Sequence, residues 1–181
     1  MSGSNPATIP AHISAEDLAK AIGRSTEEVL AALKEREEPS APLDYVDADV
    51  AVKVAKSLGS EIQVESRDLA LEYLYEFETR GESAAPSEGR VAELFDGVVN
   101  NLENLDARIE KASQHWSVSR MPAVDRNILR LGLYELEHHE GTSTAVIVSE
   151  SVRLAQTYST EKSSSFVNGV LSALASDIKG R

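Results

Sequence analysis

Three acidic residues occupy positions at which a helical pattern would place apolar side chains. Read as a helix, residues 123–140 (AVDRNILRLGLYELEHHE) direct Asp125 and Glu135 into a broad apolar arc, and Glu150 falls between apolar positions of a later helix. Two half-buried carboxylates, such as Glu135 and Glu150, could act as a general acid and a general base in catalysis. The sequence does not bring the two helices together, so a catalytic role and a structural role both stay open.

Structural pairing is the interpretation that we favour. A buried carboxylate is costly unless a cation or a helix N-terminus compensates it, and the chain supplies Arg120, Arg130 and Arg153 as candidate partners. On the helix of the first two acids, Arg126, Arg130 and Glu137 fall on the face opposite the apolar arc. We expect that face to meet solvent.

The other reactive residue types form no constellation. The chain has no cysteine, which excludes thiolate metal ligands, cysteine nucleophiles and disulfides. No histidine has a second histidine four residues away, and His138 and His139 are expected to end a helix, where an imidazolium complements the helix dipole. Three serines before Phe166 are typical of a helix N-cap, and no glycine-rich phosphate loop is present. We therefore expect no enzyme activity, no metal and no cofactor.

Charge and hydropathy limit the classes of partner. The net charge is −12, to which residues 1–60 contribute −4 and residues 61–181 contribute −8. Neither part is the basic arm that commonly holds phosphate backbones. The sequence shows neither a run of about 18 apolar residues nor a signal-peptide pattern, so we expect a cytoplasmic protein without a membrane segment.

Helical spacing of apolar residues predicts an all-α fold. Ser14 and Gly23 mark the ends of a first short helix, Ser25 with Glu28 forms a capping box that begins a second, and Asp47 is expected to cap a third. Longer helices are expected within residues 65–81, 88–116 (two helices meeting near 100–104), 122–141, 144–159 and 163–178. In the last of these, the glycine of "NGV" (168–170) is interpreted as a close packing point.

These patterns divide the chain into three parts. Residues 1–12, with two prolines, are expected to form a disordered lead-in. Residues 13–60 are expected to form a small three-helix module, and residues 61–181 a longer helical domain. Because three short helices bury little apolar surface, the module would be marginal alone.

The order of three motifs resembles the NusB family of transcription antitermination factors. The motifs are "RDLALEYLYEFE" (67–78), "HWSVSRMPAVDRNILRLGLYELEHH" (115–139) and "AVIVSESVRLAQTYSTEKSSSFVNGVLSALA" (145–175), and the resemblance covers about residues 64–178. It implies an all-helical domain of two packed bundles with a non-enzymatic role. By resemblance, the expected partners are boxA RNA, the small-subunit ribosomal protein NusE and the RNA polymerase antitermination complex, with a homodimer as an open alternative.

The resemblance and the aromatic and basic residue types together suggest site residues. The residues expected to bind RNA are Arg67, Tyr75, Lys162, Ser165 and Phe166. The residues expected to bind the partner protein are Tyr73, Glu76 and Tyr158. The residues expected to be structural are Asp125, Glu135, Glu150, Asn168 and Gly169. At these helical spacings, Tyr75 and Phe166 are equally well suited to the core.

The sequence departs from the family at three places, one of which is Ser149 in "VSE" (148–150), where the family usually has an asparagine. Family members usually begin the domain with a run of arginines, whereas "EIQVESRD" (61–68) keeps only Arg67 and adds two glutamates. Lys162 stands where an acid is common. Loss of several phosphate contacts lowers RNA affinity, so the alternative function is a protein-interaction module that has lost most RNA affinity.

Residues 13–59 are similar, more weakly, to the N-terminal helical module of bacterial translation initiation factor two, through "AEDLAKAIGRSTEEVLAALK". This similarity implies either an added docking module or an acidic cover that competes with RNA for the neighbouring site.

Overall fold

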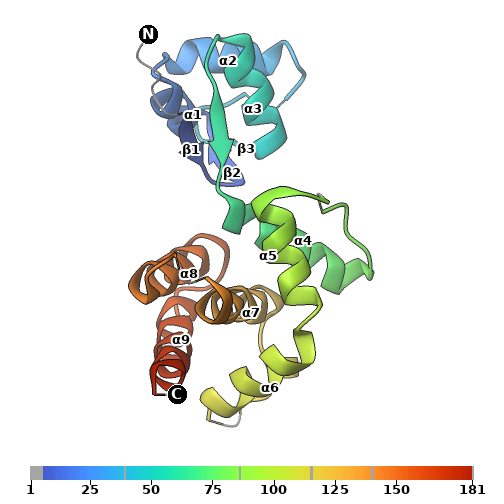
Figure 1. Cartoon of the computed structure of the whole chain (residues 1–181). Helices are drawn as coiled ribbons and strands as arrows, with labels where there is room; N and C mark the ends of the chain where they lie inside the picture. The colour runs from blue at the N-terminus through green and yellow to red at the C-terminus, as the bar shows by residue number, and fades with distance from the viewer. Residues whose placement is uncertain (1–5, 39, 86, 115, 140, 181) are drawn as a thin grey trace. The chain divides into compact units, whose positions relative to one another are not determined.

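The chain divides into two compact units, Met1–Leu69 and Ala70–Arg181 (Figure 1). The computed structural model describes residues 6–38, 40–85, 87–114, 116–139 and 141–180. The division falls inside helix α4, and each unit has its own hydrophobic core.

The described part of the first unit combines short helices with short strands. Its elements are β1 (Ala7–Ile9), β2 (His12–Ser14), α1 (Ala15–Ile22), α2 (Thr26–Lys34), β3 (Tyr45–Asp47), α3 (Ala48–Ser57) and β4 (Ile62–Val64). Strand β1 pairs with β4 in parallel, and β2 pairs with β3 in the antiparallel sense. The helices pack around a core that includes Leu18, Val29, Leu33 and Val54.

Local capping signals fix the ends of the first two helices as the sequence predicts. Ser14 is the N-cap of α1, and its hydroxyl accepts a hydrogen bond from a backbone N–H of the first turn. Gly23 ends α1 in the left-handed conformation, with φ of 66°. Ser25 and Glu28 form both hydrogen bonds of the capping box at the start of α2. These predictions are confirmed.

Asp47 occupies the predicted N-cap position of α3 but makes no side-chain capping bond. Its carboxylate instead lies 2.9 Å from Nδ1 of His12, the residue opposite it in the β2–β3 pair. The inward neighbours on the two strands, Ile13 and Val46, are buried. The side chain therefore joins two strands, and its partner, 35 residues away, leaves no local pattern in the sequence.

The strands correct the prediction for the start of the chain. Residues 1–5 lie outside the described residues, but residues 7–9 form β1, and Ile9 is buried opposite Val64. A disordered lead-in over residues 1–12 is therefore wrong from residue 7 onward. The first unit also continues past residue 60, because β4 completes the pairing of β1. Pairing between strands this far apart leaves no local periodicity to recognise.

The described part of the second unit is helical, as the sequence predicts. Its elements are α4 (Ser66–Arg80, shared with the first unit), α5 (Gly89–Val99), α6 (Leu102–Ala112), the short 3₁₀ helix η1 (Val118–Arg120), α7 (Ala123–His138), α8 (Thr144–Tyr158) and α9 (Ser163–Lys179). The break between α5 and α6 falls in the predicted region, and the β-branched run at 146–148 is helical. No helix in the described ranges is both long and apolar enough to cross a membrane.

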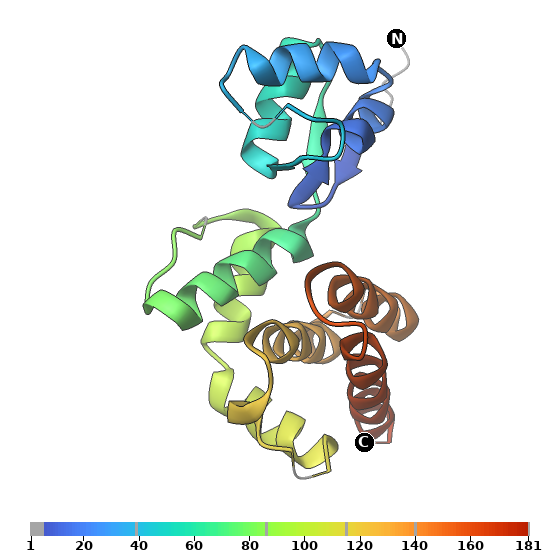
Figure 2. The same cartoon turned by 180° about the vertical axis from the view of Figure 1, so that it is seen from behind.

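Helix α7 is the centre of the second unit. It packs against α5 and α6 on one side and against α8 and α9 on the other (Figures 1 and 2). Nine of its residues are buried, among them Ile128, Leu129, Leu131 and Leu133. The motif that carries the family resemblance is therefore the core of the unit.

The close packing points of the second unit are Gly97 and Gly132. A Cβ at Gly132 would lie 2.7 Å from Oγ of Ser151 and 2.8 Å from a methyl of Leu171, and one at Gly97 would overlap the ring of Tyr134. At Gly169, a Cβ would meet nothing within 4 Å. The interpretation of Gly169 as a packing point is therefore wrong, because that side of α9 faces away from its neighbours.

Candidate functional site

Three of the residues expected to bind RNA lie together at the start of α9. Lys162 is the N-cap residue of the helix, and Ser165 and Phe166 belong to its first turns. Lys162 and Ser165 are exposed, whereas Phe166 is half-buried against the core. Among the residues that the structure describes, none forms an ion pair with Lys162. The turn therefore presents an ammonium group and a hydroxyl to solvent, above an anchored aromatic ring.

Asp125 holds this turn in place from α7. The buried carboxylate accepts hydrogen bonds from the hydroxyl of Ser163, at 2.8 Å, and from that of Ser159. Ser159 ends α8 and Ser163 begins α9, so one side chain fixes the connection between the two helices. The prediction that the serines provide an N-cap is wrong: Lys162 is the N-cap, and Ser163 donates to Asp125 instead.

One further aromatic residue, Trp116, lies at this turn and was not predicted to belong to the site. Trp116 packs edge-to-face on Phe166, with ring centroids 5.6 Å apart. In the sequence, Trp116 is recognisable only as part of the motif at 115–139. A position before η1 carries no periodic signal that would have placed the ring beside α9.

Two further residues expected to bind RNA lie on α4. Tyr75 is 45% exposed, so it is not a core residue. Arg67, which belongs to the first unit, has a side chain only 15% exposed, and its guanidinium lies 3.4 Å from the carboxylate of Glu65. The one arginine kept from the family's basic run is thus partly neutralised within the chain.

The residues expected to bind a partner protein lie on two helices. Tyr73 and Glu76 on α4 are half-buried, and Glu76 accepts a 2.7 Å hydrogen bond from Arg80. Tyr158, at the end of α8, is half-buried against the core. Each of these three side chains contacts its own domain and also has a part that is exposed to solvent.

Glu135 is fully buried and has a cation as its partner. It accepts a 2.7 Å hydrogen bond from Nη2 of Arg90 on α5. The same arginine lies 3.2 Å from Glu93 and 2.8 Å from Nε2 of His139. Arg90 was not among the partners that the sequence offered for this acid.

Burial, followed by the nearby Arg90 guanidinium, lowers the pKa of His139 below its usual value of 6.5. Glu93 and Glu135 oppose this shift without overcoming it. The imidazole of His139 therefore favours its neutral form, and the expected role of this residue as a cation at the helix end is wrong. Desolvation is the largest of the effects on this pKa.

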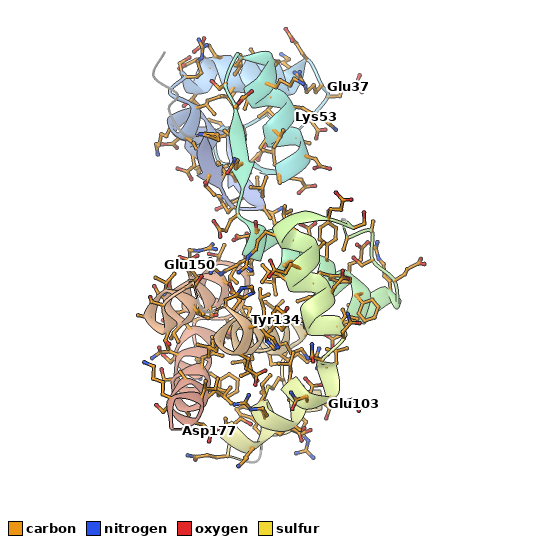
Figure 3. The ribbon with its side chains drawn as sticks, in the orientation of Figure 1. Glu37, Lys53, Glu103, Tyr134, Glu150 and Asp177 are labelled. Atoms are coloured by element: carbon orange, nitrogen blue, oxygen red, sulfur yellow. The ribbon has the colours of Figure 1, made fainter. Side chains whose placement is uncertain are left out.

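Glu150, labelled in Figure 3, is only half-buried. It pairs at 2.9 Å with Arg153, one of the predicted partners, on the same helix. Arg90 thus contacts Glu135, and Arg153 contacts Glu150. Among the residues that the structure describes, no group of three or more His, Cys, Asp or Glu side chains could hold a metal ion.

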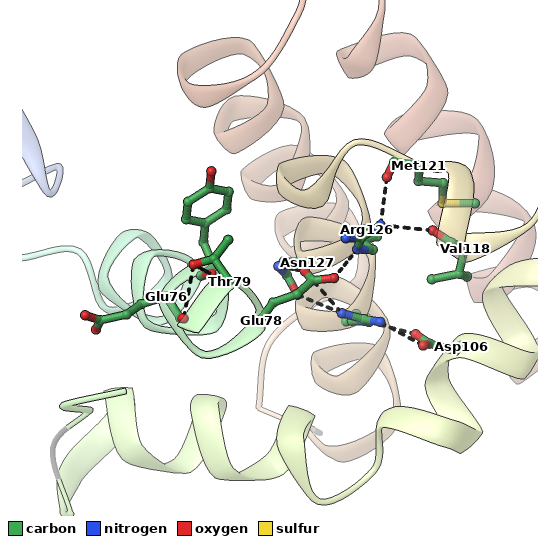
Figure 4. A network of polar contacts seen from close by, with 10 residues as sticks. Glu76, Glu78, Thr79, Asp106, Val118, Met121, Arg126 and Asn127 are labelled. Carbon is green, nitrogen blue, oxygen red and sulfur yellow. Dashed lines mark hydrogen bonds and ion pairs between the residues drawn. The ribbon is translucent and has the colours of Figure 1, made fainter. Parts of the chain in front are cut away.

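The face of α7 expected to meet solvent is in fact packed against α4 and α6 (Figure 4). Arg130 makes two 2.7 Å hydrogen bonds to Asp106 on α6 and one of 3.1 Å to Asn127. Arg126 donates to Glu78 on α4, which also accepts a 2.7 Å bond from Asn127. Glu137, further along the helix, pairs with Arg108. The prediction of a solvent face is wrong because acids on other helices supply the partners.

Comparison with known proteins decides the family. The sequence model described as "NusB family" matches residues 50–176. The chain belongs to the NusB family. Its match includes the whole of α7 and the α9 turn, and the solved NusB structures share its helical fold.

Two curated NusB relatives differ in the length that is matched. A transcription antitermination protein NusB of Geobacter sp. (strain M21) is 42% identical over 48% of this chain and 60% of its own length. One of Sorangium cellulosum (strain So ce56) is 40% identical over 62% of this chain and 90% of its own length. The chain thus spans less than two thirds of the first of these relatives.

Two solved structures share the NusB fold with the chain. A crystal structure of T. maritima NusB has a TM-score of 0.57 at 28% identity, over 62% of this chain and 89% of that one. A crystal structure of the antitermination factors NusB and NusE in complex with double-stranded RNA has a TM-score of 0.54 at 32% identity, over 62% of this chain and 94% of that one. Neither match extends over the whole of this chain.

Proposed function

We propose that this NusB-family protein binds boxA-type RNA together with a NusE-type partner and acts in transcription antitermination. The observation that carries the proposal is the match to a structure of NusB with NusE and RNA, at 32% identity over 94% of that chain. Curated relatives that carry the NusB name are described as antitermination proteins. RNA polymerase, in its antitermination complex, is the wider assembly that we infer.

The RNA surface that we propose centres on the start of α9. Lys162 supplies a cation, Ser165 a hydroxyl, and Phe166 the apolar base beneath them. Tyr75 is proposed to contribute from α4. Arg67, which belongs to the first unit, is proposed as a separate RNA contact. Tyr73, Glu76 and Tyr158 are proposed to contact the partner protein. Aromatic rings and cations in this combination suit single-stranded RNA.

The role that we propose is non-enzymatic and cytoplasmic. The inward acids that a catalytic hypothesis would use are engaged elsewhere: Glu135 with Arg90, Glu150 with Arg153, and Asp125 with two serines. Asp125, Glu135 and Glu150 are thus proposed to be structural residues. Asn168 is exposed, and we assign it no structural role.

A titration of labelled boxA RNA tests the proposal. RNA anisotropy is measured with protein alone and with a NusE-type partner, at low and at physiological salt. We expect binding that is tightened by the partner and weakened by salt. A flat signal in both titrations at low salt would remove RNA binding from the proposal.

A second function, binding of proteins alone, is favoured by the state of Arg67. Its side chain is 15% exposed and faces Glu65, within a chain of net charge −12. If this function is correct, capture of the ribosomal partner or the polymerase survives treatment with RNase. Complexes that disappear under RNase contradict it.

A further inference from the structure

Trp116 is an exposed aromatic residue that is held in a fixed position. Its side chain is 55% exposed, although its ring packs on Phe166, which in turn packs on the core. An indole that is anchored on one side and open on the other has already lost much of its freedom. A ligand that covers it therefore meets a preorganised surface.

The turn that carries Trp116 is fixed by hydrogen bonds on both sides. The hydroxyl of Ser113 donates to the backbone carbonyl of Trp116 at 2.9 Å. The carboxylate of Glu110 accepts from the hydroxyl of Ser117 at 3.0 Å and from the backbone N–H of Val118 at 2.9 Å. These contacts hold the indole beside α9 without covering it.

We propose that the indole of Trp116 stacks on an unpaired base of the bound RNA. This inference rests on the proposed function and adds a residue to its RNA surface. Lys162 and Ser165 lie in the same turns of α9 as Phe166, the ring on which Trp116 packs. A nucleotide whose base covers the indole could thus have its phosphate near an ammonium group and a hydroxyl.

The surroundings of Trp116 suit an RNA base better than the surface of a partner protein. In the described part of the second unit, Tyr75, Trp116 and Val146 are the large apolar residues that are exposed. Protein docking needs a contiguous apolar area of several hundred Å². A single base needs only one ring face. The exposed ring of Trp116, packed on Phe166 in the first turns of α9, meets the second requirement.

The protein contains one tryptophan, so its fluorescence reports directly on this site. The full chain is titrated with boxA RNA carrying a label for anisotropy, while tryptophan emission is recorded. We expect the emission to be quenched over the same RNA concentrations at which anisotropy rises. RNA that binds without changing the emission overturns this inference and leaves the proposed function in place. Absence of binding refutes both.

Variants at position 116 give the second measurement. Trp116→Ala is expected to weaken RNA binding by about 5- to 150-fold, the range for one stacked base, whereas Trp116→Phe retains most of the affinity. Tyr45→Ala removes a comparably exposed aromatic residue of the first unit and is the matched control, with unchanged affinity. Circular dichroism verifies the fold of each variant. Wild-type affinity in Trp116→Ala, or emission quenched by the NusE-type partner without RNA, would overturn the inference.

Discussion

The carboxylate of Glu135 accepts a 2.7 Å hydrogen bond from the guanidinium of Arg90, which joins the middle of α7 to the start of α5. Arg90→Met removes a guanidinium that pairs with this fully buried carboxylate. We expect the free energy of unfolding to fall by about 3 kcal/mol or more, as measured by urea denaturation. Arg80→Met is the control, because the Arg80 side chain is exposed and its surface pair with Glu76 is worth less than about 1 kcal/mol. Equal losses in the two variants would contradict a structural role for the buried pair.

The connection between α8 and α9 is expected to depend on Asp125. Asp125→Ala leaves the hydroxyls of Ser159 and Ser163 without their acceptor, and we expect a loss of about 2 to 3 kcal/mol in thermal or urea unfolding. Asp125→Asn keeps one acceptor oxygen and loses less. Asp49→Ala, at an exposed position of α3, changes stability by under about 0.5 kcal/mol. A fully stable Asp125→Ala variant would show that the serines find other partners.

Two glycines on neighbouring helices are expected to respond to alanine with opposite signs. Gly132→Ala forces a methyl group against Ser151 and Leu171, and overpacking of this kind costs about 1 to 3 kcal/mol. Gly169→Ala adds a methyl group in open space inside a helix, which stabilises the protein by about 0.5 to 1 kcal/mol. The measurement is the melting temperature, which we expect to fall in Gly132→Ala and to rise in Gly169→Ala. The same sign for both would mean that the two environments are not as different as the geometry indicates.

The stability of the protein is expected to depend on His139 between neutral and mildly acidic pH. Because its pKa in the folded state is lowered, the unfolded chain binds a proton more readily, and stability falls as the pH drops below about 6.5. His139→Asn is expected to flatten this part of the pH profile, measured by urea unfolding from pH 7.5 to pH 5. Replacement of the exposed His138 by Gln leaves the half-buried imidazole of His139 in place, and should retain the wild-type profile. An unchanged slope in His139→Asn would refute the assignment.

Lys162 is expected to make one phosphate contact. Lys162→Ala should weaken boxA binding and reduce the slope of log affinity against log salt by about 0.7, the value for one contact to a single strand. Lys53→Ala, on α3 of the first unit, removes an equally exposed lysine and leaves the slope unchanged (Figure 3). If both variants alter the slope equally, the effect comes from net charge and not from the α9 turn.

Prediction from the sequence succeeded where the signal is local. Ser14, Gly23 and the capping box of Ser25 and Glu28 act within three or four residues of their partners, so their roles are visible in the printed order of residues. The helices of the second unit were found by the same kind of pattern, and the family by the order of its motifs. The strands were missed because their partners are distant in the chain.

Prediction of the site residues was limited for the same reason, because contacting residues are far apart in the sequence. The sequence placed Lys162, Ser165 and Phe166 in one turn but gave no reason to add Trp116, which reaches Phe166 from another segment. It also assigned close packing to Gly169 on composition alone, although that side of α9 is open. A helical position shows which way a residue points, but not whether a neighbouring helix is there.

The sequence by itself determined the helices, their ends, the absence of thiol chemistry and the family. Only the tertiary structure decided which group pairs with each inward acid. It also decided which glycine allows two helices to pack closely, and which aromatic ring is exposed to solvent. The reason is range: Arg90 and Glu135 are 45 residues apart, and Asp125 and Ser163 are 38 apart. Capping and helical periodicity act over about four residues, whereas a buried charge is stabilised only by what the fold brings to it.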